Sequence, residues 1–491
     1  MTIERIGVVG AGTMGAGIAQ LGCLGGFETL LHDPVGEILS SAPERIGTAL
    51  EKGAAGGRWS GAEAEAASGR LRPCGSLSEL AGCGLVIEAA PERLELKREL
   101  FASLAAECRP DAVLATNTSS LSVTAIAAAV PGPERVVGMH FFNPPALMAL
   151  VEVVAGEESG EGALALAEEV ARGMGRTPVR AADEIGFIVN RCARPYSLEA
   201  LRLLGARIAG HETIDRICRI GGGFRMGPFE LTDLVGVDVN LDVARSFWEQ
   251  SFCEPRWQPH PIQARMVAAG RIGRKAGRGY YDYGNGPHRP EDPPAPGLGE
   301  GMGAGADQGE GAAGGRGRKG AERGPRGPET VEGEGFRALA LERGSLGALA
   351  TGEDAVGFLA LPDPASATLV ELTRGPATRA QTAAAAESHF RALGKQVEWV
   401  GDAPGLVLGR IVCQLVNEAH FALGAGVAGA DDIDTAMRLG LNYPRGPFEW
   451  CEAIGPTRVL AIVDALHAEL GEERYRAAPA LRRAAATGRG R

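Results

Sequence analysis

The sequence has little that would suit a secreted, membrane-spanning or nucleic-acid-binding protein. None of its nine cysteines belongs to a C-x-x-C pair, and none has zinc-ligand spacing to a histidine, so we expect reduced thiols and no metal site. No apolar run approaches the roughly 20 residues that span a bilayer. The formal net charge of −11, from 61 acidic and 50 basic residues, argues against a surface that neutralises nucleic-acid phosphates.

The chain also lacks the pattern of a secretory signal peptide. Its first residues, MTIERIGVVGAG, are interrupted by charged side chains and lead directly into a glycine-rich turn. Together with the scattered cysteines, this start predicts a cytoplasmic protein.

The chain does have the length and apolar content for several packed domains, with 491 residues of which 45% are hydrophobic. In the first 155 residues, short apolar runs alternate with amphipathic stretches, which indicates βαβ units and a mostly parallel sheet. From Gly186 the pattern becomes helical. The expected strands are Ile6–Val9, Thr29–His32, Leu85–Glu88, Val113–Thr116, Val136–Phe141 and Leu150–Val154.

A segment between Gly284 and about Gly335 has a different composition from the rest of the chain. Gly, Pro and charged residues dominate it. Such a segment cannot bury enough apolar surface to offset the entropy of ordering it. We therefore predict a disordered linker, after which the helical pattern returns.

An internal repeat joins the two sides of this linker. GMHFFNPPALMALVEV, from Gly138, aligns without gaps on GFLALPDPASATLVEL, from Gly357, so the register is 357 − 138 = 219. The same offset pairs DEIGFIVNR with DAPGLVLGR, and MGPFEL with RGPFEW. A constant register over separated matches indicates a duplication. Only about two dozen ordered-looking residues separate the linker from Gly357, so the duplicate has no room for its own nucleotide-binding fold.

These patterns predict an α/β Rossmann domain followed by an all-α helical domain and a second, degenerate copy of that helical domain. The expected boundaries are a Rossmann domain at 1–185, a helical domain at 186–284, a disordered linker at 285–335, a truncated Rossmann remnant at 336–401 and a second helical domain at 402–491.

A glycine-rich turn lies between the first expected strand and the helical stretch after it. A G-x-G-x-x-G motif by itself also occurs in ordinary turns, but a strand before it and a helix after it are typical of dinucleotide binding. Gly10 allows the tight turn, Gly12 lets the backbone approach a pyrophosphate, and Gly15 lets the helix pack on the strand. Thr13 and Met14 complete the motif at the helix N-terminus, whose free N–H groups favour phosphate.

An acidic residue, Asp33, ends the next expected strand, TLLHD. A carboxylate there accepts hydrogen bonds from the adenosine ribose hydroxyls and repels a 2′-phosphate, which favours NAD over NADP. The alternative is a solvated acid at the end of a strand.

Polar residues also stand at the ends of later strands, where open α/β sheets bind ligands. His140 lies inside an otherwise apolar strand, and Glu152 lies twelve residues later in the next apolar run. Taken separately, each reads more simply as a core residue whose hydrogen bonds are satisfied. Taken together, they suggest a histidine–carboxylate pair in which the acid orients the ring and stabilises the imidazolium.

The motifs NTSSL, HFFNP, LVEV, GFIVNR, MGPFEL and KAGRGYYDY follow one another between Asn117 and Tyr283. In the order and spacing of these motifs, the chain from Met1 to about Gly284 resembles the L-3-hydroxyacyl-CoA dehydrogenase family. The resemblance implies that His140 is the general base and Glu152 its partner, and that Ser119 and Asn190 hydrogen-bond the reacting oxygen or the imidazole. The cofactor contacts that it implies are Glu92, Lys97, Asn117 and Lys275.

The duplicated half differs from this pattern at the chemical positions. Leu359 stands where the first half has His140, and Gly409 where it has Asn190, although Glu371 matches Glu152. Without a base or an amide the duplicate cannot run the reaction, so we interpret it as structural.

Two departures concern the first half. Ala149 stands where relatives often carry a cation. Basic residues that could contact the CoA phosphates are few between Ile38 and Lys52, with Arg45 and Lys52 as the candidates for substrate binding.

The function implied by the resemblance is NAD-dependent oxidation of a (3S)-3-hydroxyacyl-CoA to the 3-oxoacyl-CoA, in fatty acid β-oxidation or aromatic-acid degradation. Bacterial relatives with a second C-terminal domain are often assigned to 3-hydroxybutyryl-CoA or 3-hydroxyadipyl-CoA. The expected partners are NAD and an acyl-CoA. We expect binding to neither nucleic acid nor a membrane, and the sequence leaves open whether the protein forms a homodimer.

Two alternatives remain at this point. A dehydrogenase of free hydroxy acids, of the gulonate type, shares this fold and the histidine–glutamate pair, but needs a cation for the substrate carboxylate, and none is evident beside HFFNPP. A non-catalytic nucleotide-binding protein is the other. The presence of Ser119, His140, Glu152 and Asn190 together argues against it.

Overall fold

The computed structural model describes residues 3–284, 286–292, 330–350 and 352–490, which pack into two compact units. The first unit consists of Met1–Arg194, Ser246–Cys253 and Glu418–Phe448. The second consists of Pro195–Arg245, Glu254–Asn417 and Glu449–Arg491. Within the described ranges, no helix is long and apolar enough to cross a membrane.

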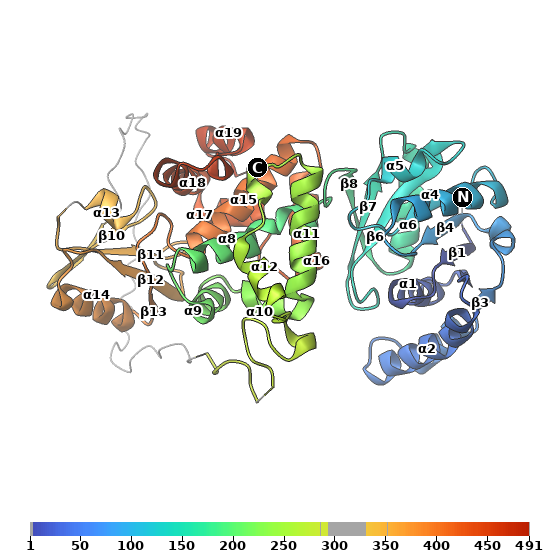
Figure 1. The fold of residues 1–491 in the computed structure, drawn as a ribbon, viewed down its shortest axis with the longest axis horizontal. Helices are drawn as coiled ribbons and strands as arrows, with labels where there is room; N and C mark the ends of the chain where they lie inside the picture. Colours follow the sequence, from blue (N-terminus) through green and yellow to red (C-terminus); the bar gives the residue numbers. More distant parts are fainter. Residues whose placement is uncertain (1–2, 285, 293–329, 351, 491) are drawn as a thin grey trace, which may run out of the picture. The chain divides into compact units, whose positions relative to one another are not determined.

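The first unit contains an eight-stranded sheet in the order β3-β2-β1-β4-β5-β6-β7-β8 (Figure 1). All neighbouring strands are parallel except β6 and β7, which are antiparallel. The expectation of a mostly parallel sheet is therefore confirmed. The strands are β1 (Arg5–Val9), β2 (Glu28–His32), β3 (Leu71–Cys74), β4 (Leu85–Glu88), β5 (Val113–Thr116), β6 (Val136–Phe141), β7 (Leu150–Ala155) and β8 (Thr177–Ala182).

The central strands are buried along their whole length, which is why they read as continuous apolar runs in the sequence. The two edge strands, β3 and β8, are absent from the strands that the sequence predicts. β3 contains Arg72 and Pro73, and β8 contains Pro178 and Arg180, so neither has an apolar run. The helices of this Rossmann domain are α1 (Thr13–Leu24), α2 (Gly36–Ala55), α3 (Gly61–Ser68), α4 (Leu94–Glu107), α5 (Val123–Ala127) and α6 (Glu161–Gly173).

Residues from far along the chain complete the first unit. Helix α16 (Ala430–Leu441) packs on β7, β8 and the short helix α7 (Val189–Cys192). At Gly440 a β-carbon would lie 2.9 Å from Leu150 Cδ2, so this helix makes a close approach to the sheet. The backbone N–H of Ala182, at the end of β8, donates to Val427 O at 2.8 Å.

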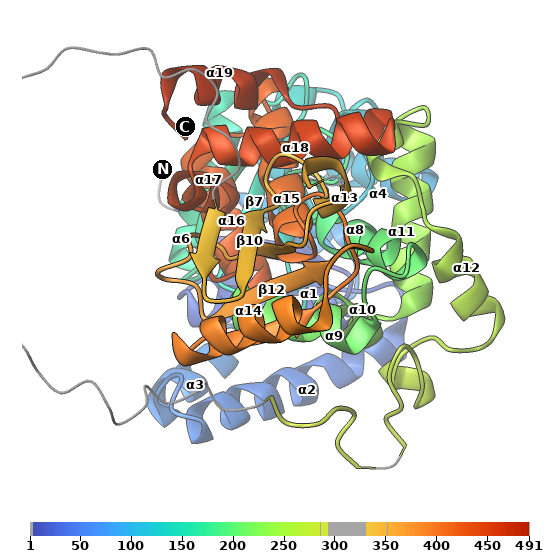
Figure 2. The same cartoon turned by 90° about the vertical axis from the view of Figure 1, so that its left-hand side faces the viewer.

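The second unit contains a five-stranded sheet in the order β13-β12-β11-β10-β9, with α14 (Ala380–Ala392) packed on it (Figure 2). β11 and β12 are antiparallel, like β6 and β7 of the large sheet. β12 and β13 are parallel, like β7 and β8. The strands are β9 (Thr330–Gly333), β10 (Phe336–Ala340), β11 (Val356–Leu359), β12 (Leu369–Arg374) and β13 (Gln396–Trp399).

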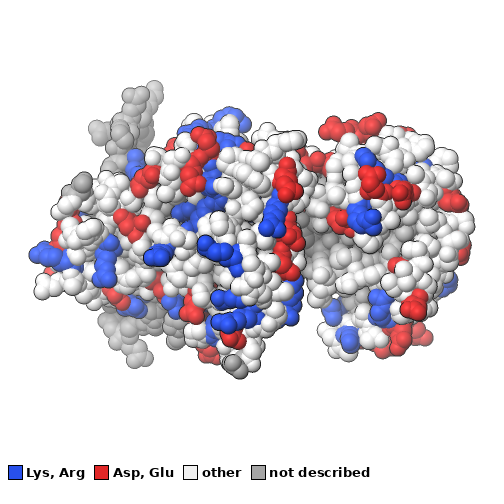
Figure 3. Space-filling view, in the orientation of Figure 1, with Lys and Arg blue, Asp and Glu red and all other residues white. Residues whose placement is uncertain are grey.

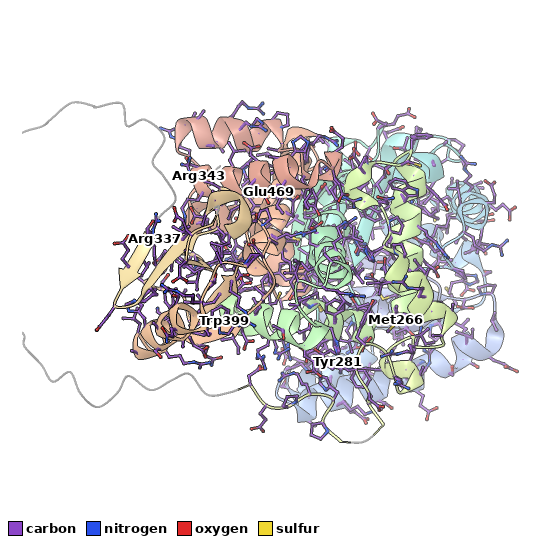
Figure 4. All side chains as sticks on the ribbon, turned by 60° about the vertical axis from the view of Figure 1, so that its left-hand side comes forward. Met266, Tyr281, Arg337, Arg343, Trp399 and Glu469 are labelled. Atoms are coloured by element: carbon purple, nitrogen blue, oxygen red, sulfur yellow. The ribbon has the colours of Figure 1, made fainter. Side chains whose placement is uncertain are left out.

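The second unit also contains helices. Trp399, at the end of β13, donates from Nε1 to Glu387 on α14, and Glu469 accepts from Ser345 N at the start of α13 (Leu346–Leu349) (Figure 4). Four helices contribute residues to both units: α8 (Arg194–Gly205), α11 (Val237–Gln250), α15 (Leu408–Gly424) and α17 (Pro447–Ile454). The others are α9 (His211–Arg216), α10 (Pro228–Val235), α12 (Pro261–Ala268), α18 (Pro456–Leu470) and α19 (Pro479–Thr487).

The predicted linker at 285–335 is too long at its C-terminal end. Strand β9 begins at Thr330, inside the predicted linker. It pairs with β10 in an antiparallel hairpin at the edge of the small sheet. On the other side, Asp292 accepts from Arg219 at 2.7 and 2.9 Å. Most of the predicted linker, namely 285 and 293–329, lies outside the described residues.

Contacts recur at the offset found in the sequence. In the first unit Ala182 N donates to Val427 O, and in the second unit Gly401 N donates to Ile208 O. The two donors and the two acceptors are repeat equivalents, since 401 − 182 and 427 − 208 both equal 219. Each unit thus joins its sheet to segments from a distant part of the chain. Acidic and basic side chains are interspersed over the face drawn in Figure 3.

Candidate active site

The glycine-rich turn has the geometry that its sequence predicts. Gly10 has φ +101°, and a β-carbon on it would lie 2.6 Å from Ala89 O. A β-carbon on Gly15 would lie 1.7 Å from Gly10 O, so neither position tolerates a side chain. Gly12 is the N-cap of α1, and no side chain caps that helix. A β-carbon on Gly12 would meet nothing within 4 Å, which leaves room for a pyrophosphate beside the free N–H groups.

Asp33 is tied to this turn. Its Oδ2 accepts from Ala11 N at 2.8 Å and its Oδ1 accepts from Val35 N at 2.9 Å. Arg45, predicted as a contact for CoA, donates from Nη2 to Ala11 O at 2.7 Å, so it holds α2 against the glycine turn. Lys52, the other basic candidate, is exposed on α2, and its ammonium has no partner among the described residues.

His140 and Glu152 form the predicted pair. They are directly opposite each other on the antiparallel strands β6 and β7, and His140 Nδ1 lies 2.6 Å from Glu152 Oε2. The histidine is 6% exposed and the glutamate 0%. Because the carboxylate fixes the proton on Nδ1, Nε2 is the ring nitrogen left to accept a proton.

The other oxygen of Glu152 is also held. Oε1 accepts from Ile188 N at 3.0 Å and from Val189 N at 2.8 Å, at the start of helix α7. Aromatic rings flank the histidine: Phe142 lies 4.4 Å away and Phe187 5.8 Å away between ring centroids. The carboxylate therefore has two backbone donors and the ring in fixed positions, and apolar side chains limit the access of water to the pair.

The loop after β5 carries Asn117 and Ser119. Asn117 Oδ1 accepts from Phe141 N at 2.8 Å, which fixes the strand end next to His140. Glu92 Oε1 accepts from Thr118 Oγ1 at 2.6 Å and from Ser119 N at 2.9 Å. Burial opposes the ionisation of Glu92, but the bond from Thr118 and the charge of Lys97 outweigh it, so its pKa lies below the usual value.

The sequence interpretation missed a buried network beneath this loop. Lys97, expected to contact the cofactor, is 1% exposed, and its Nζ lies 2.6 Å from Glu88 Oε1 and 3.4 Å from Glu92 Oε2. Glu88 also accepts from Ala90 N at 2.6 Å and from Thr116 Oγ1 at 2.7 Å. The signal was present in the sequence, because LVIE ends an apolar strand on a carboxylate. The network shapes the turn between β4 and α4.

The remaining predicted residues differ in their surroundings. Asn190 lies on α7 and Ser119 follows β5, and neither side chain has a hydrogen-bond partner among the described residues. Both are thus available to a ligand. Lys275 belongs to the second unit, where its Nζ pairs with Asp238 Oδ2 at 2.6 Å.

The smaller sheet contains a similar arrangement without the histidine. Glu371 is opposite Leu359, and its oxygens accept from Val407 N at 2.8 Å and Leu408 N at 3.0 Å. Burial raises the pKa of Glu371 to about 8, against the effect of these two bonds. A β-carbon on Gly409 would lie 2.6 Å from Leu359 Cδ2, so the leucine fills the space that a side chain at 409 would need.

Comparisons with known proteins cover the whole chain. The family profile described as 3-hydroxyacyl-CoA dehydrogenase, NAD binding domain, matches residues 5–184, and the C-terminal domain of the same family matches residues 186–283 and 405–491. The chain is 38% identical to the 3-hydroxyadipyl-CoA dehydrogenase of Escherichia coli (strain K12), over 99% of this chain and 98% of that protein.

Two further proteins are similar to this chain. The chain is 41% identical to the 3-hydroxybutyryl-CoA dehydrogenase of Mycobacterium tuberculosis, over 57% of this chain and 99% of that protein. The crystal structure of 3-hydroxybutyryl-CoA dehydrogenase from Escherichia coli K12 matches with a TM-score of 0.89 and 36% identity, over 99% of both chains.

Proposed function

Because this chain belongs to the 3-hydroxyacyl-CoA dehydrogenase family, its activity is the NAD-dependent oxidation of a 3-hydroxyacyl-CoA, and we propose that His140 is the general base of that reaction. The observation that supports this role is the 2.6 Å contact between His140 Nδ1 and the buried Glu152 carboxylate. A ring nitrogen held in this way leaves Nε2 to take the proton of the substrate hydroxyl.

Glu152 orients the ring and offsets the charge that forms on it. With one oxygen on Nδ1 and the other on two backbone N–H groups, the carboxylate cannot turn away when the imidazolium forms. Bound NAD supplies the acceptor for the C3 hydride, and the glycine turn with Asp33 is the group of residues that would hold it.

Ser119 and Asn190 are the proposed donors to the substrate oxygen. Both side chains lack a partner among the described residues, and both lie on segments fixed by Glu92 or Glu152. A donor placed where charge grows in the transition state contributes about 2.7–4 kcal/mol to catalysis.

For the substrate we infer a short acyl-CoA, of the 3-hydroxybutyryl or 3-hydroxyadipyl type, in the (3S) configuration. Support comes from the names of relatives that align over nearly the whole chain or over the catalytic half. Arg45, whose Nη2 donates to Ala11 O, and Lys52 are the proposed contacts for the CoA phosphates. A panel of 3-hydroxyacyl-CoAs and the corresponding free hydroxy acids, assayed for NADH formation, tests this inference.

The second half of the repeat is proposed to be a degenerate, non-catalytic copy. The support is that Leu359 and Gly409 stand at the positions that correspond to His140 and Asn190. Glu371, which corresponds to Glu152, still accepts two backbone hydrogen bonds. The glycine turn of the first unit has no equivalent among the described residues of the second.

The test of the proposed base is His140→Gln. We expect kcat to fall by about 10²–10⁴ while NAD affinity stays nearly unchanged, because the base does not contact the glycine turn. Steady-state kinetics and calorimetric titration with NAD measure the two quantities. Activity within a few fold of the wild type would exclude His140 as the base.

A further inference from the structure

Helix α7 carries much of the catalytic geometry. The backbone at its start supplies both donors to Glu152 Oε1, from Ile188 and Val189, and Asn190 is the next residue. The helix has only four residues, Val189–Cys192, which is too short to be stable without packing. Its position must therefore be set by what it contacts.

A buried ion pair holds α7 from the distant end of the chain. Arg191 Nε donates to Glu418 Oε1 at 3.1 Å, and the two side chains are 5% and 3% exposed. Glu184, on the first half, lies 3.7 Å from Arg191 and is 47% exposed. Because Glu418 is the closer carboxylate and is buried, it is the stronger of these two counter-charges.

Close packing from the same distant segment meets α7 on its apolar side. A β-carbon on Gly440 would lie 3.0 Å from Val189 Cγ2 and 2.9 Å from Leu150 Cδ2, so α16 lies directly against the residue that donates to Glu152. Ala182 N, in the segment that leads to α7, donates to Val427 O.

We propose that Glu418 is a positioning residue for the catalytic base: through Arg191 it fixes helix α7, and through the N–H groups of α7 it fixes Glu152 and thereby His140. The non-catalytic half of the chain thus completes the active site of the other half without contacting the substrate. The inference rests on the proposed function of His140.

The chain offers a matched control. The second unit contains the related buried pair, Arg410 Nε to Glu199 Oε2 at 2.8 Å, with both side chains 6% exposed. The residues correspond at the repeat offset of 219 (410 − 191 and 418 − 199). This pair adjoins the site that has Leu359 in place of a base. Glu199→Gln and Glu418→Gln therefore remove similar charges, but only the second lies against catalytic α7.

The experiment compares both variants in the full-length protein. Glu418→Gln is expected to lower kcat by about tenfold to 100-fold with NAD affinity within twofold, since a small misplacement of catalytic groups has that effect. Glu199→Gln is expected to keep kcat within about twofold. Both should lower the midpoint of thermal unfolding, because each leaves an arginine with less counter-charge.

A second, milder pair applies if Glu418→Gln does not fold. Gly440→Ala presses on Val189, and Gly221→Ala is its counterpart, where a β-carbon would lie 3.3 Å from Leu408 Cδ2 (440 − 221 is again 219). We expect Gly440→Ala to lower kcat more than Gly221→Ala does.

The outcomes separate this inference from the proposed function. Equal kcat for the two glutamate variants, or for the two glycine variants where those are used, overturns the positioning role. If His140→Gln retains activity, the proposed base is wrong whatever Glu418→Gln does. A loss of kcat in Glu418→Gln and His140→Gln, with Glu199→Gln active, supports both.

Discussion

Two buried glutamates at corresponding positions differ in what stands opposite them. Glu152 and Glu371 each accept two backbone N–H groups at the start of a helix, but Glu152 faces His140 and Glu371 faces Leu359. A carboxyl without a basic neighbour in an apolar site favours its protonated form. Glu371, which has no such neighbour, therefore has a raised pKa.

Glu371 should make the protein less stable as the pH rises. Its folded pKa of about 8 lies above the value of about 4.3 for an unfolded glutamate, so the folded state binds the extra proton. Its stabilising contribution is complete below about pH 4 and is lost between that value and about pH 8, by at most about 1.4 kcal/mol per pH unit. Glu371→Gln should flatten this part of the curve, measured by denaturant unfolding at several pH values. Parallel curves for the two proteins would contradict the assignment.

Asp33 should set the choice of cofactor. Asp33→Ala removes a ribose acceptor, a charge that repels a 2′-phosphate and the bond to Ala11 N, so NAD affinity should fall and the preference over NADP should narrow. Asp33→Asn keeps an acceptor without the charge, and should narrow the preference with a smaller loss of NAD affinity. Titrations with both cofactors measure this. A wild-type preference for NADP would refute the argument.

At the scale of residues, the sequence predicts the pair His140–Glu152 because a polar residue stands in each of two apolar strands. It cannot show that Lys97 is buried, since its partner Glu88 lies on another element and burial depends on tertiary packing. The individual contacts to NAD and CoA stay predictions.

At the scale of elements, the six apolar runs are sufficient to predict the centre of the large sheet, whereas edge strands with proline and arginine are not recognisable. The sequence also does not predict the short helix α7 or the packing of α16 on it. Nothing in the local pattern of Val189–Cys192 indicates which distant segment it contacts. Arg191 and Glu418 are an example, because they pair at a sequence separation of 227.

The turn between β4 and α4 yields a prediction about stability. Lys97→Met leaves Glu88 buried next to an apolar side chain and should lower the free energy of unfolding by about 3–5 kcal/mol. Lys52→Met, on the exposed side of α2, is the control and should change it by less than about 0.5 kcal/mol. Urea denaturation compares the two. If the variants are equally stable, the Lys97–Glu88 pair does not hold this turn.

At the scale of the whole molecule, each unit contains segments from widely separated parts of the chain. A chain that ends before residue 356 lacks Glu418–Phe448, which covers β7, β8 and α7 in the first unit. We expect this truncated chain to aggregate or to unfold at a lower temperature, because the apolar side chains of Leu150 and Val189, and the charge of Arg191, lose the contacts that this segment supplies. Size-exclusion chromatography and thermal unfolding test it; a stable, active truncated enzyme would contradict the expectation.

The intact chain should bind one NAD. The second unit has no described equivalent of the glycine turn, so Leu359→His should restore a histidine opposite Glu371 without adding a cofactor site. Calorimetric titration should give one site per chain for both the wild type and this variant. Two sites would show that the C-terminal half is not the non-catalytic copy inferred above.

The separation of Arg191 from Glu418 also has a consequence for biosynthesis. A ribosome must synthesise the whole stretch from α7 to Glu418 before this counter-charge of Arg191 exists. Until then, the nascent Rossmann sheet has apolar side chains of β7 exposed, which is the condition under which chaperones and neighbouring nascent chains bind. If Glu418 positions α7 as proposed, the site is encoded in the first part of the message but is completed only after Glu418 has been synthesised.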